Sequence, residues 1–168
     1  YMPEVKDTCD FWAVNVYTRQ LINSRKEMFR FDRYEASSIH SLDVPYFSDD
    51  ICPEVIYHCL NRLKDKPVLI TENGIACKND KYRIIYIAAV LQAVKQAMDS
   101  GVKVLGYLHW SLLDNWEWGT YTPTFGLASV DHETYKRTLK PSGYFYGEIV
   151  ENNALTLNVI KKYYSNNI

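Results

Sequence analysis

Three mostly apolar runs, separated by longer segments with helical periodicity, constrain the fold of this 168-residue chain. They cover residues 11–18, 68–71 and 102–110, and each has the continuous hydrophobic character of parallel strands whose sheet is covered on both faces. Parallel strands need crossover connections, which helices usually supply. The pattern therefore predicts an α/β protein with the chain order strand, helix, strand, helix, strand.

Helical periodicity fills the segments between these runs. In the longer segment, apolar residues recur at intervals of three and four, as one face of a helix requires: Ile84, Ile87, Ala88, Leu91, Val94 and Met98. Gly101 follows this stripe and offers the left-handed residue at which helices commonly stop. Pro53 is expected to open a shorter helix, with Asp49 or Asp50 as its cap. The apolar stripe of this shorter helix is Ile56, Cys59, Leu60 and Leu63.

The other segments carry weaker signals. Residues 19–50 are rich in Arg, Asp and Ser and lack a long periodic segment, so an extended surface loop is expected there. Pro141 is expected to start a last helix. This helix would run through Tyr144, Phe145 and Ile149. The sequence then turns polar, so residues 152–168 are predicted to form a tail that frays.

Charge and hydropathy exclude several kinds of partner. The 19 basic and 20 acidic residues are mixed along the chain and give a net charge of −1, so no surface for nucleic acid or for an anionic membrane is expected. No apolar run approaches the roughly 20 residues of a membrane span, and no signal peptide is recognisable. We therefore expect a cytoplasmic protein whose partner is a small molecule.

The spacing of cysteine and histidine gives no indication of a metal site. The cysteines form no C-x-x-C pair and lie among apolar residues, so we expect all four to be reduced and buried: Cys9, Cys52, Cys59 and Cys77. The four histidines are equally scattered: His40, His58, His109 and His132. No metal and no cofactor are therefore expected.

Two architectures are compatible with this pattern, an open doubly wound sheet and part of a (β/α)8 barrel. No G-x-G-x-x-G or Walker loop follows any of the runs, whereas the conspicuous polar residues lie at strand carboxyl ends, where barrel active sites assemble. We therefore predict part of a barrel. Three strands cannot close a barrel, so the other strands are expected to come from elsewhere, and a start at Tyr1 is what an excised or split piece would show.

Two acidic residues stand at the ends of these strands in an aromatic setting. Glu72 ends the second run before an Asn-Gly turn signal, and Glu117 lies between Trp116 and Trp118 just beyond the third run. Two carboxylates beside aromatic faces suggest glycoside chemistry, and they would form a nucleophile and acid pair if they lay about 5 to 5.5 Å apart, as retention requires. Alternatively, Glu72 is a structural acid paired with an Arg or Lys, and Trp116 packs in the core.

Five short motifs occur in order along the chain. They are ITENG (70–74), WSLLDNWEW (110–118), FGL (125–127), VD (130–131) and KPS (140–142). Together they resemble glycoside hydrolase family 1, the β-glucosidase family, and DFWAVNVYT (10–18) is similar to the sixth barrel strand of that family. The other two runs then resemble the seventh and eighth strands. The resemblance implies that residues 1–168 are the carboxyl-terminal portion of a single TIM (β/α)8 barrel domain.

The resemblance implies a reaction centre on the first two runs. Glu72 would be the nucleophile that attacks the anomeric carbon of a sugar, a role that requires an ionised carboxylate. Tyr17 would donate a hydrogen bond that stabilises this charged form. Asn15, two residues earlier and on the same side of its strand, would contact the sugar or its neighbours.

The resemblance also implies a sugar-binding subsite beyond the third run. Glu117 would bind the distal sugar hydroxyls through charge-assisted hydrogen bonds, and Trp118 would donate its indole N–H to a neighbouring hydroxyl. Trp110 would stack against the sugar ring, and Phe125 would form an apolar wall. Relatives that act on 6-phosphorylated sugars replace this Glu-Trp pair, so an unphosphorylated β-D-glucoside is the favoured substrate.

Two departures from the family pattern affect these expectations. Val16 stands where the N-Y-Y-T segment has a tyrosine, which we expect to be a mild change, and the N-E-P glutamate that serves as acid/base is not found in this sequence. The resemblance therefore implies a retaining β-glucosidase-like enzyme, working through a covalent glycosyl-enzyme on Glu72, that is completed by an N-terminal barrel part or a second chain. This chain alone would be inactive. The alternatives are a catalytically silent barrel fragment that acts as an interaction or self-assembling module, and a sugar-binding lectin.

Overall fold

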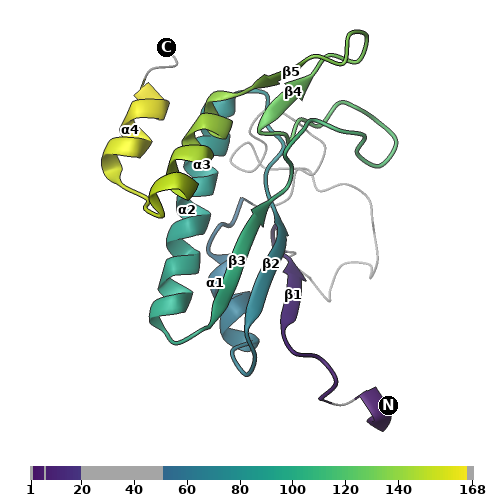
Figure 1. Ribbon diagram of the computed structural model, residues 1–168, viewed down its shortest axis with the longest axis vertical. Helices are drawn as coiled ribbons and strands as arrows, with labels where there is room; N and C mark the ends of the chain where they lie inside the picture. Colours follow the sequence, from purple (N-terminus) through teal and green to yellow (C-terminus); the bar gives the residue numbers. More distant parts are fainter. Residues whose placement is uncertain (1, 6, 20–50, 166–168) are drawn as a thin grey trace, which may run out of the picture.

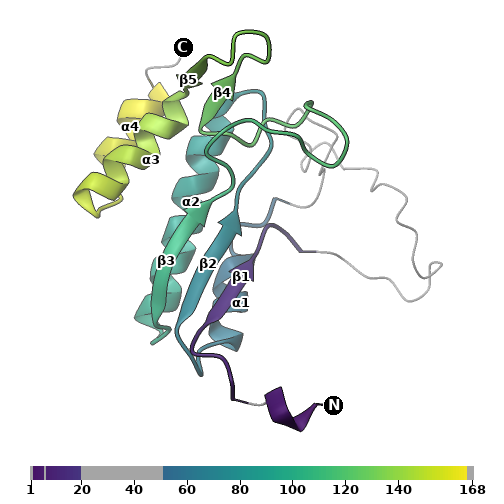
Figure 2. The same cartoon turned by 45° about the vertical axis from the view of Figure 1, so that its right-hand side comes forward.

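The structure, a computed structural model, describes residues 2–5, 7–19 and 51–165. Its centre is a three-stranded parallel sheet in the order β1–β2–β3 (Figure 1). The strands are β1 (Trp12–Asn15), β2 (Val68–Asn73) and β3 (Val104–His109). Helices α1 (Val55–Arg62) and α2 (Asp80–Asp99) lie on one face of this sheet (Figure 2). The expected strand and helix order is confirmed, although β1 is shorter than predicted and β2 continues through Asn73.

Apart from one short turn at the start of the chain, the remaining elements follow β3. A 3₁₀ turn, η1 (Pro3–Val5), precedes β1, whereas β4 (Ala128–Val130) and β5 (Arg137–Leu139) form an antiparallel hairpin after β3. Next come α3 (Pro141–Asn152) and α4 (Leu157–Ser165), which pack beside α2, and α3 also contacts β3 through Tyr146 (Figure 1).

The prediction of a frayed tail over residues 152–168 is wrong for residues 157–165. Asn153 ends α3 in a left-handed conformation with a φ of 47°, and the chain then turns back into α4. Val159, Ile160 and Tyr163 of α4 pack against a buried cluster between α2 and α3. The sequence hides this contact because α4 buries a narrow apolar stripe and exposes a polar face.

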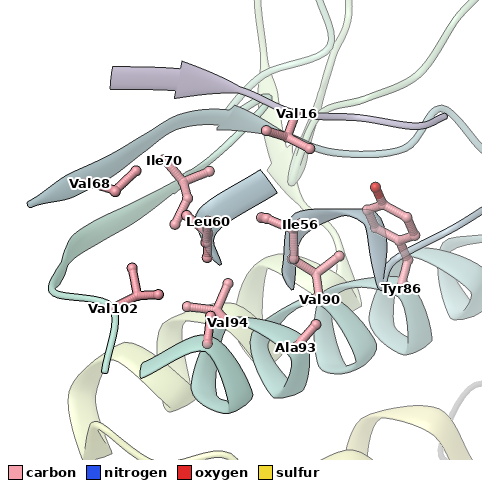
Figure 3. Packing of buried hydrophobic residues seen from close by; sticks show 11 residues of the cluster. Val16, Ile56, Leu60, Val68, Ile70, Tyr86, Val90, Ala93, Val94 and Val102 are labelled. Carbon is pink, nitrogen blue, oxygen red and sulfur yellow. The ribbon is translucent and has the colours of Figure 1, made fainter. Parts of the chain in front are cut away.

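The core consists of two clusters on opposite sides of α2. The first lies between the sheet, α1 and α2 (Figure 3): Val16, Ile56, Leu60, Val68, Ile70, Tyr86, Val90, Ala93, Val94, Ala97 and Val102. The second lies between α2 and α3: Ile84, Ile87, Ala88, Leu127, Phe145 and Ile149. The predicted single stripe on α2 therefore divides between two clusters, and Met98, which was assigned to that stripe, is 47% exposed.

Several local expectations differ from the structure. The first helix begins at Val55 rather than Pro53, and its N-cap, Glu54, makes no side-chain capping bond. None of the four cysteines forms a disulfide, but only Cys52 and Cys77 are buried, whereas Cys9 is exposed. Tyr144 lies on the exposed side of α3. The expected loop over residues 19–50 and the caps Asp49 and Asp50 lie outside the described residues, apart from residue 19.

Candidate active site

The two predicted reaction-centre residues meet at the carboxyl end of the sheet. Glu72 is the penultimate residue of β2 and lies in register with Asn15, the last residue of β1. The Tyr17 hydroxyl donates a 2.9 Å hydrogen bond to Glu72 Oε2. Glu72 is half-buried, so its carboxylate sits at the rim of the sheet rather than inside the core. The hydrogen bond that the sequence predicted is therefore present.

An irregular register turns Glu72 toward Tyr17. The pairing of β1 with β2 shifts after Val14, so that Asn15 pairs with Glu72 and skips Thr71. Thr71 Oγ1 donates a 2.6 Å hydrogen bond to Asn15 Oδ1, while its neighbour Glu72 accepts from Tyr17. Adjacent residues of a regular strand point to opposite faces of the sheet. Because of the bulge, the side chains of Thr71 and Glu72 can both reach the segment that contains Asn15 and Tyr17.

The surroundings of Tyr17 keep its phenol protonated. Burial, followed by the hydrogen bond to Glu72 and the charge of Glu72, raises the pKa of Tyr17 well above its ordinary value of 10.0. The charge of Glu117 acts in the same direction, so both candidate carboxylates lie close enough to influence this phenol. Phe125, which is buried, packs edge-on against the Tyr17 ring with 6.3 Å between ring centroids. Tyr17 is therefore a hydrogen-bond donor to Glu72 throughout the neutral range.

Glu117 and Trp110 form a second pair beyond β3. The Trp110 indole Nε1–H donates a 2.9 Å hydrogen bond to Glu117 Oε1, and Glu117 is only 5% exposed. Trp118 has a positive φ of 47° and is 84% exposed, so its indole lies at the surface of the described structure. Trp116 is also exposed and packs edge-on against Tyr121 rather than in the core. The core-packing alternative for Trp116 is therefore wrong.

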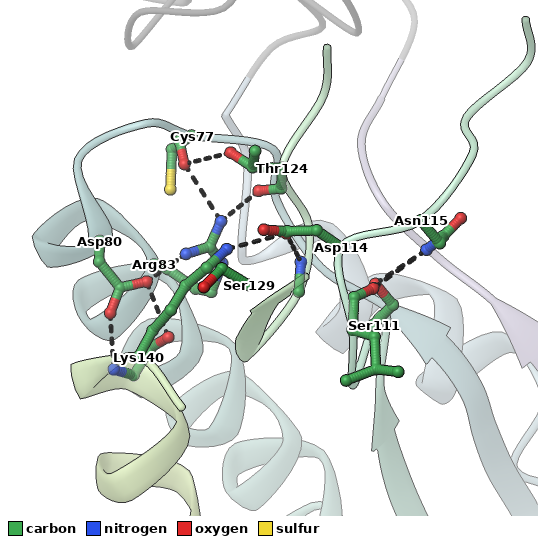
Figure 4. A network of polar contacts seen from close by, with 12 residues as sticks. Cys77, Asp80, Arg83, Ser111, Asp114, Asn115, Thr124, Ser129 and Lys140 are labelled. Carbon is green, nitrogen blue, oxygen red and sulfur yellow. Dashed lines mark hydrogen bonds and ion pairs between the residues drawn. The ribbon is translucent and has the colours of Figure 1, made fainter. Parts of the chain in front are cut away.

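Arg83 supports the segment that carries Phe125. Its fully buried guanidinium pairs with Asp80 and donates to the backbone carbonyls of Cys77, at 3.2 Å, and Thr124 (Figure 4). Because Thr124 precedes Phe125, these bonds fix the chain at the point where it reaches the site. No local signal in the sequence predicts this arrangement, since Arg83 interrupts the apolar periodicity of α2.

Two further acids, Asp80 and Asp114, contact the scaffold rather than the reaction centre. Asp80 accepts hydrogen bonds from Ser142 N, at 2.6 Å, and from Ser142 Oγ, at 2.8 Å, which places a negative charge at the start of α3. Asp114 accepts from Gly126 N and from Lys140 Nζ, both at 2.8 Å (Figure 4). The KPS segment and the aspartate of WSLLDNWEW therefore hold the loop after β3 against α2 and α3.

Sequence analysis missed the residues behind Glu72. Asn73, read as part of a turn, is the last residue of β2 and is 1% exposed. It accepts a 2.8 Å hydrogen bond from the Tyr107 hydroxyl and donates to Val16 O at 2.6 Å. Tyr86, on α2, donates to Tyr17 O at 3.1 Å. Asn73, Tyr86 and Tyr107 lie on separate elements, so in the sequence they appear only as isolated polar residues.

Within residues 2–5, 7–19 and 51–165, no three His, Cys, Asp or Glu side chains gather as metal ligands would. In the same part of the chain, no helix combines the length and apolar composition of a membrane span.

Comparison with known proteins places the chain in one family. The family model for Glycosyl hydrolase family 1 matches residues 2–155. The 1,4-beta-D-glucan glucohydrolase of Thermotoga neapolitana is 35% identical over 173 residues, which cover 92% of this chain and 37% of that protein. The beta-galactosidase of Saccharolobus solfataricus is 35% identical over 164 residues, covering 91% of this chain and 34% of the relative.

Solved structures of β-glycosidases also match this chain. The beta-glycosidase from Pyrococcus horikoshii matches with a TM-score of 0.76 at 35% identity, over 92% of this chain and 37% of the neighbour. The beta-glucosidase from Thermotoga maritima in complex with glucoimidazole matches with a TM-score of 0.76 at 33% identity, over 90% of this chain and 37% of the neighbour. The chain thus spans little more than a third of the length of these relatives. It belongs to glycosyl hydrolase family 1, and its open three-stranded sheet is part of the (β/α)8 barrel of that family.

Proposed function

We propose that the complete protein is a retaining β-glycosidase in which Glu72 is the nucleophile. The observation that carries this proposal is the hydrogen bond from Tyr17 to Glu72 at the carboxyl end of a parallel sheet. Family membership supports it, since the relatives include enzymes named as β-glucosidases and β-galactosidases. A carboxylate with a fixed phenol donor meets the needs of a nucleophile that must be ionised and oriented before it attacks.

In the proposed reaction, Glu72 attacks the anomeric carbon while the glycosidic bond breaks. The leaving oxygen takes a proton from the acid/base carboxylic acid, and the sugar remains bound to Glu72 as an ester. Water, deprotonated by the same acid/base group, then displaces Glu72 with a second inversion, so the product keeps the configuration of the substrate. Tyr17 stabilises the carboxylate that starts this cycle and the carboxylate that the cycle regenerates.

The acid/base group is proposed to come from outside this sequence, which contains no N-E-P segment. An N-terminal barrel part, in the same polypeptide or in a second chain, would supply it together with the first five strands. The exposed leucines of β3, Leu105 and Leu108, support such completion, because apolar side chains of a barrel strand are normally covered. This chain alone would then be inactive.

The proposed substrate is an unphosphorylated β-D-glucoside. Glu117, buried and oriented by Trp110, would bind sugar hydroxyls, and hydrogen bonds to a charged acceptor contribute about 1.5 to 3 kcal/mol each. The loop that follows carries Thr120, Thr122 and Thr124 and no cation for a sugar phosphate. A relative from Bifidobacterium breve, 36% identical over 62% of this chain, is named as a bifunctional beta-D-glucosidase/beta-D-fucosidase, so we also expect activity on fucosides.

Covalent labelling tests this proposal. The completed protein is treated with a 2-deoxy-2-fluoro glucoside that carries a good leaving group, digested, and mapped by mass spectrometry. We expect the label on the peptide that contains Glu72, and no label in Glu72→Gln. Label on a different carboxylate would overturn the assignment of the nucleophile.

A second candidate function is a catalytically silent module that associates through its sheet. The outer edges of β1 and β3 pair with no strand among the described residues, and free edges promote association between chains. Size measurement combined with a chromogenic glucoside separates the two. Self-association without hydrolysis, even after addition of an N-terminal barrel part, would favour the silent module, whereas restored hydrolysis supports the enzyme.

A further inference from the structure

The backbone ladder that joins β1 to β2 ends just before Tyr17. Its last bond runs from Val16 N–H to Glu72 O, at 3.0 Å. The next two carbonyls accept from side chains instead: Val16 O accepts from Asn73 Nδ2 at 2.6 Å, and Tyr17 O accepts from the Tyr86 hydroxyl at 3.1 Å. The backbone that carries the Tyr17 ring is therefore anchored by side chains behind the sheet.

These anchoring side chains form one connected group. The Tyr86 hydroxyl donates to Tyr17 O and accepts from Asn73 Nδ2 at 3.1 Å. Asn73 Oδ1 accepts from the Tyr107 hydroxyl at 2.8 Å. Both hydrogens of the Asn73 amide and its oxygen are engaged, so the orientation of the amide is determined. Asn73 follows Glu72 directly, and the same group therefore holds the chain on both sides of the Tyr17–Glu72 contact.

Tyr86 lies on the side of the sheet opposite to the candidate site. It is 4% exposed and belongs to the cluster between α2 and the sheet. Figure 3 shows its hydroxyl directed from α2 toward the segment near Val16. A phenol in this position cannot reach a sugar bound at the rim, so any influence on the reaction must act through the residues that its hydroxyl contacts, Tyr17 and Asn73.

We infer that Tyr86 is a positioning residue for the nucleophile. By holding the carbonyl of Tyr17 from behind the sheet, it places the Tyr17 phenol at hydrogen-bond distance from Glu72. The inference rests on the proposed function, because positioning matters for a reaction only if Glu72 is the nucleophile. The geometry that it predicts can nevertheless be measured in this chain without any turnover.

The pH titration of the Tyr17 phenol shows whether it is hydrogen-bonded to Glu72. The full chain is labelled with tyrosine carrying ¹³C at Cζ, and the Tyr17 signal is assigned by its loss in Tyr17→Phe. Glu72 from β2, Glu117 from the loop after β3 and Tyr86 from α2 are the titratable groups that act on Tyr17. Burial and Glu72 raise the pKa of Tyr17, so in the unaltered chain its signal should stay at the protonated position while exposed tyrosines titrate.

The variant Tyr86→Phe keeps the ring in the core and removes only the hydroxyl. We expect the pKa of Tyr17 to fall, so that its signal titrates closer to those of the exposed tyrosines, because the released phenol loses its hydrogen bond to Glu72, the cause that follows burial. The matched control is Tyr146→Phe, which removes another helix-borne phenol that donates to a strand carbonyl, Tyr107 O, at 3.0 Å. The control should leave the Tyr17 signal at the protonated position.

Activity of the completed protein provides the second readout. We expect Tyr86→Phe to lower kcat about tenfold with nearly unchanged KM. Tyr86 does not contact the sugar, so KM is unaffected, but loss of its hydroxyl misplaces Tyr17, which acts in the transition state. Tyr146→Phe should stay within about twofold of the parent in kcat. A loss shared equally by both variants would indicate general destabilisation and overturn the inference.

The outcomes separate this inference from the proposed function. If no form of the protein hydrolyses glycosides, the proposed function fails, and the titration still shows whether Tyr86 places Tyr17. If Glu72 is labelled but the Tyr17 titration is the same in Tyr86→Phe as in the parent, the positioning role alone is refuted. Should Tyr86→Phe fail to fold, Tyr86→Met, which also removes the hydroxyl and fills the core with a flexible apolar side chain, is titrated in the same way, and an unmoved Tyr17 signal there also refutes the inference.

Discussion

The Tyr17 hydroxyl and Glu72 Oε2 lie 2.9 Å apart although 55 residues separate them in the chain. Two independent segments are thus brought together by a bulge in the pairing of β1 with β2 and by the anchors behind Tyr17. A charge-assisted hydrogen bond of this kind fixes the position of a carboxylate. The rim of the sheet is therefore organised around one acid.

Removal of this donor should reduce turnover. Hydrogen bonds to charged groups contribute about 1.5 to 3 kcal/mol, so Tyr17→Phe is expected to lower kcat of the completed enzyme about 10- to 100-fold. Steady-state kinetics on a chromogenic glucoside measure the effect, with Tyr144→Phe, an exposed tyrosine of α3, as the control. An unchanged kcat in Tyr17→Phe would show that the contact has no catalytic role.

Glu117 should act on sugar recognition rather than on proton transfer. Its carboxylate is held by Trp110 Nε1, as a binding group must be, so Glu117→Ala should weaken kcat/KM to different extents for glucosides and their C4 epimers. If Glu117 were instead the acid, the loss would grow with the pKa of the leaving group, and azide would rescue the activity. Kinetics on a series of aryl glucosides and galactosides, with and without azide, decide between these roles.

The strands and the position of Glu72 at the end of one of them could be predicted because they depend on local pattern. The continuous apolar runs of β1, β2 and β3 mark buried strands, and ITENG places Glu72 at the end of one of them. The bulge that turns Glu72 toward Tyr17 could not be predicted, because register depends on how two distant segments pair. The same holds for Tyr86, whose partner Tyr17 lies 69 residues away.

The face of α2 that packs on the sheet was missed for a related reason, and it carries Tyr86, Val90, Ala93 and Ala97. A periodicity search finds one apolar stripe, whereas α2 packs against both the sheet and α3 and buries two. The fully buried Arg83 lies between these faces and looks in the sequence like a polar interruption. Tertiary contacts, rather than local propensity, decide such positions.

The buried ion pair of Arg83 should matter far more than a surface pair. Arg83→Met leaves Asp80 and the carbonyls of Cys77 and Thr124 without their buried donor, and breaking such a network costs about 3 to 5 kcal/mol. Lys95→Met removes an exposed partner of Asp99 on the same helix and should change the free energy of unfolding by about 0 to 1 kcal/mol. Urea denaturation of the two variants provides the comparison, and equal losses would contradict the assigned role of Arg83.

Two glycines should respond in opposite directions to the same substitution. A Cβ at Gly74 would overlap the backbone carbonyl of Trp110, so Gly74→Ala must displace either β2 or the loop after β3 and is expected to destabilise the protein by more than about 3 kcal/mol. Gly147 lies in α3, and a Cβ there would meet no atom within 4 Å. Because alanine favours helix over glycine by about 0.8 to 1 kcal/mol, Gly147→Ala should raise the thermal midpoint. A stable Gly74→Ala chain would show that the close approach is not required.

His109 should make the protein less stable in acid. Burial, followed by the positive charge of Arg83, lowers the pKa of His109 from 6.5 to about 3. The folded chain therefore keeps this imidazole neutral at pH values where the unfolded chain protonates it. The stability associated with the neutral form is present in full above pH 6.5 and is lost progressively as the pH falls toward about 3.

The free energy of unfolding should accordingly fall by up to about 1.4 kcal/mol per pH unit through this window, since one proton binds only to the unfolded chain. In His109→Gln this contribution disappears. The free energy of unfolding should then change less steeply with pH between about pH 6 and pH 4, by up to about 1.4 kcal/mol per pH unit, whatever the absolute stability of the variant. His132→Gln, at an exposed position of the β4–β5 hairpin, is the matched control and should keep the parental slope. Equal slopes in the parent and His109→Gln would mean that the imidazole is protonated in the folded chain, which the burial of its ring and the positive charges of Arg83 and Lys140 oppose.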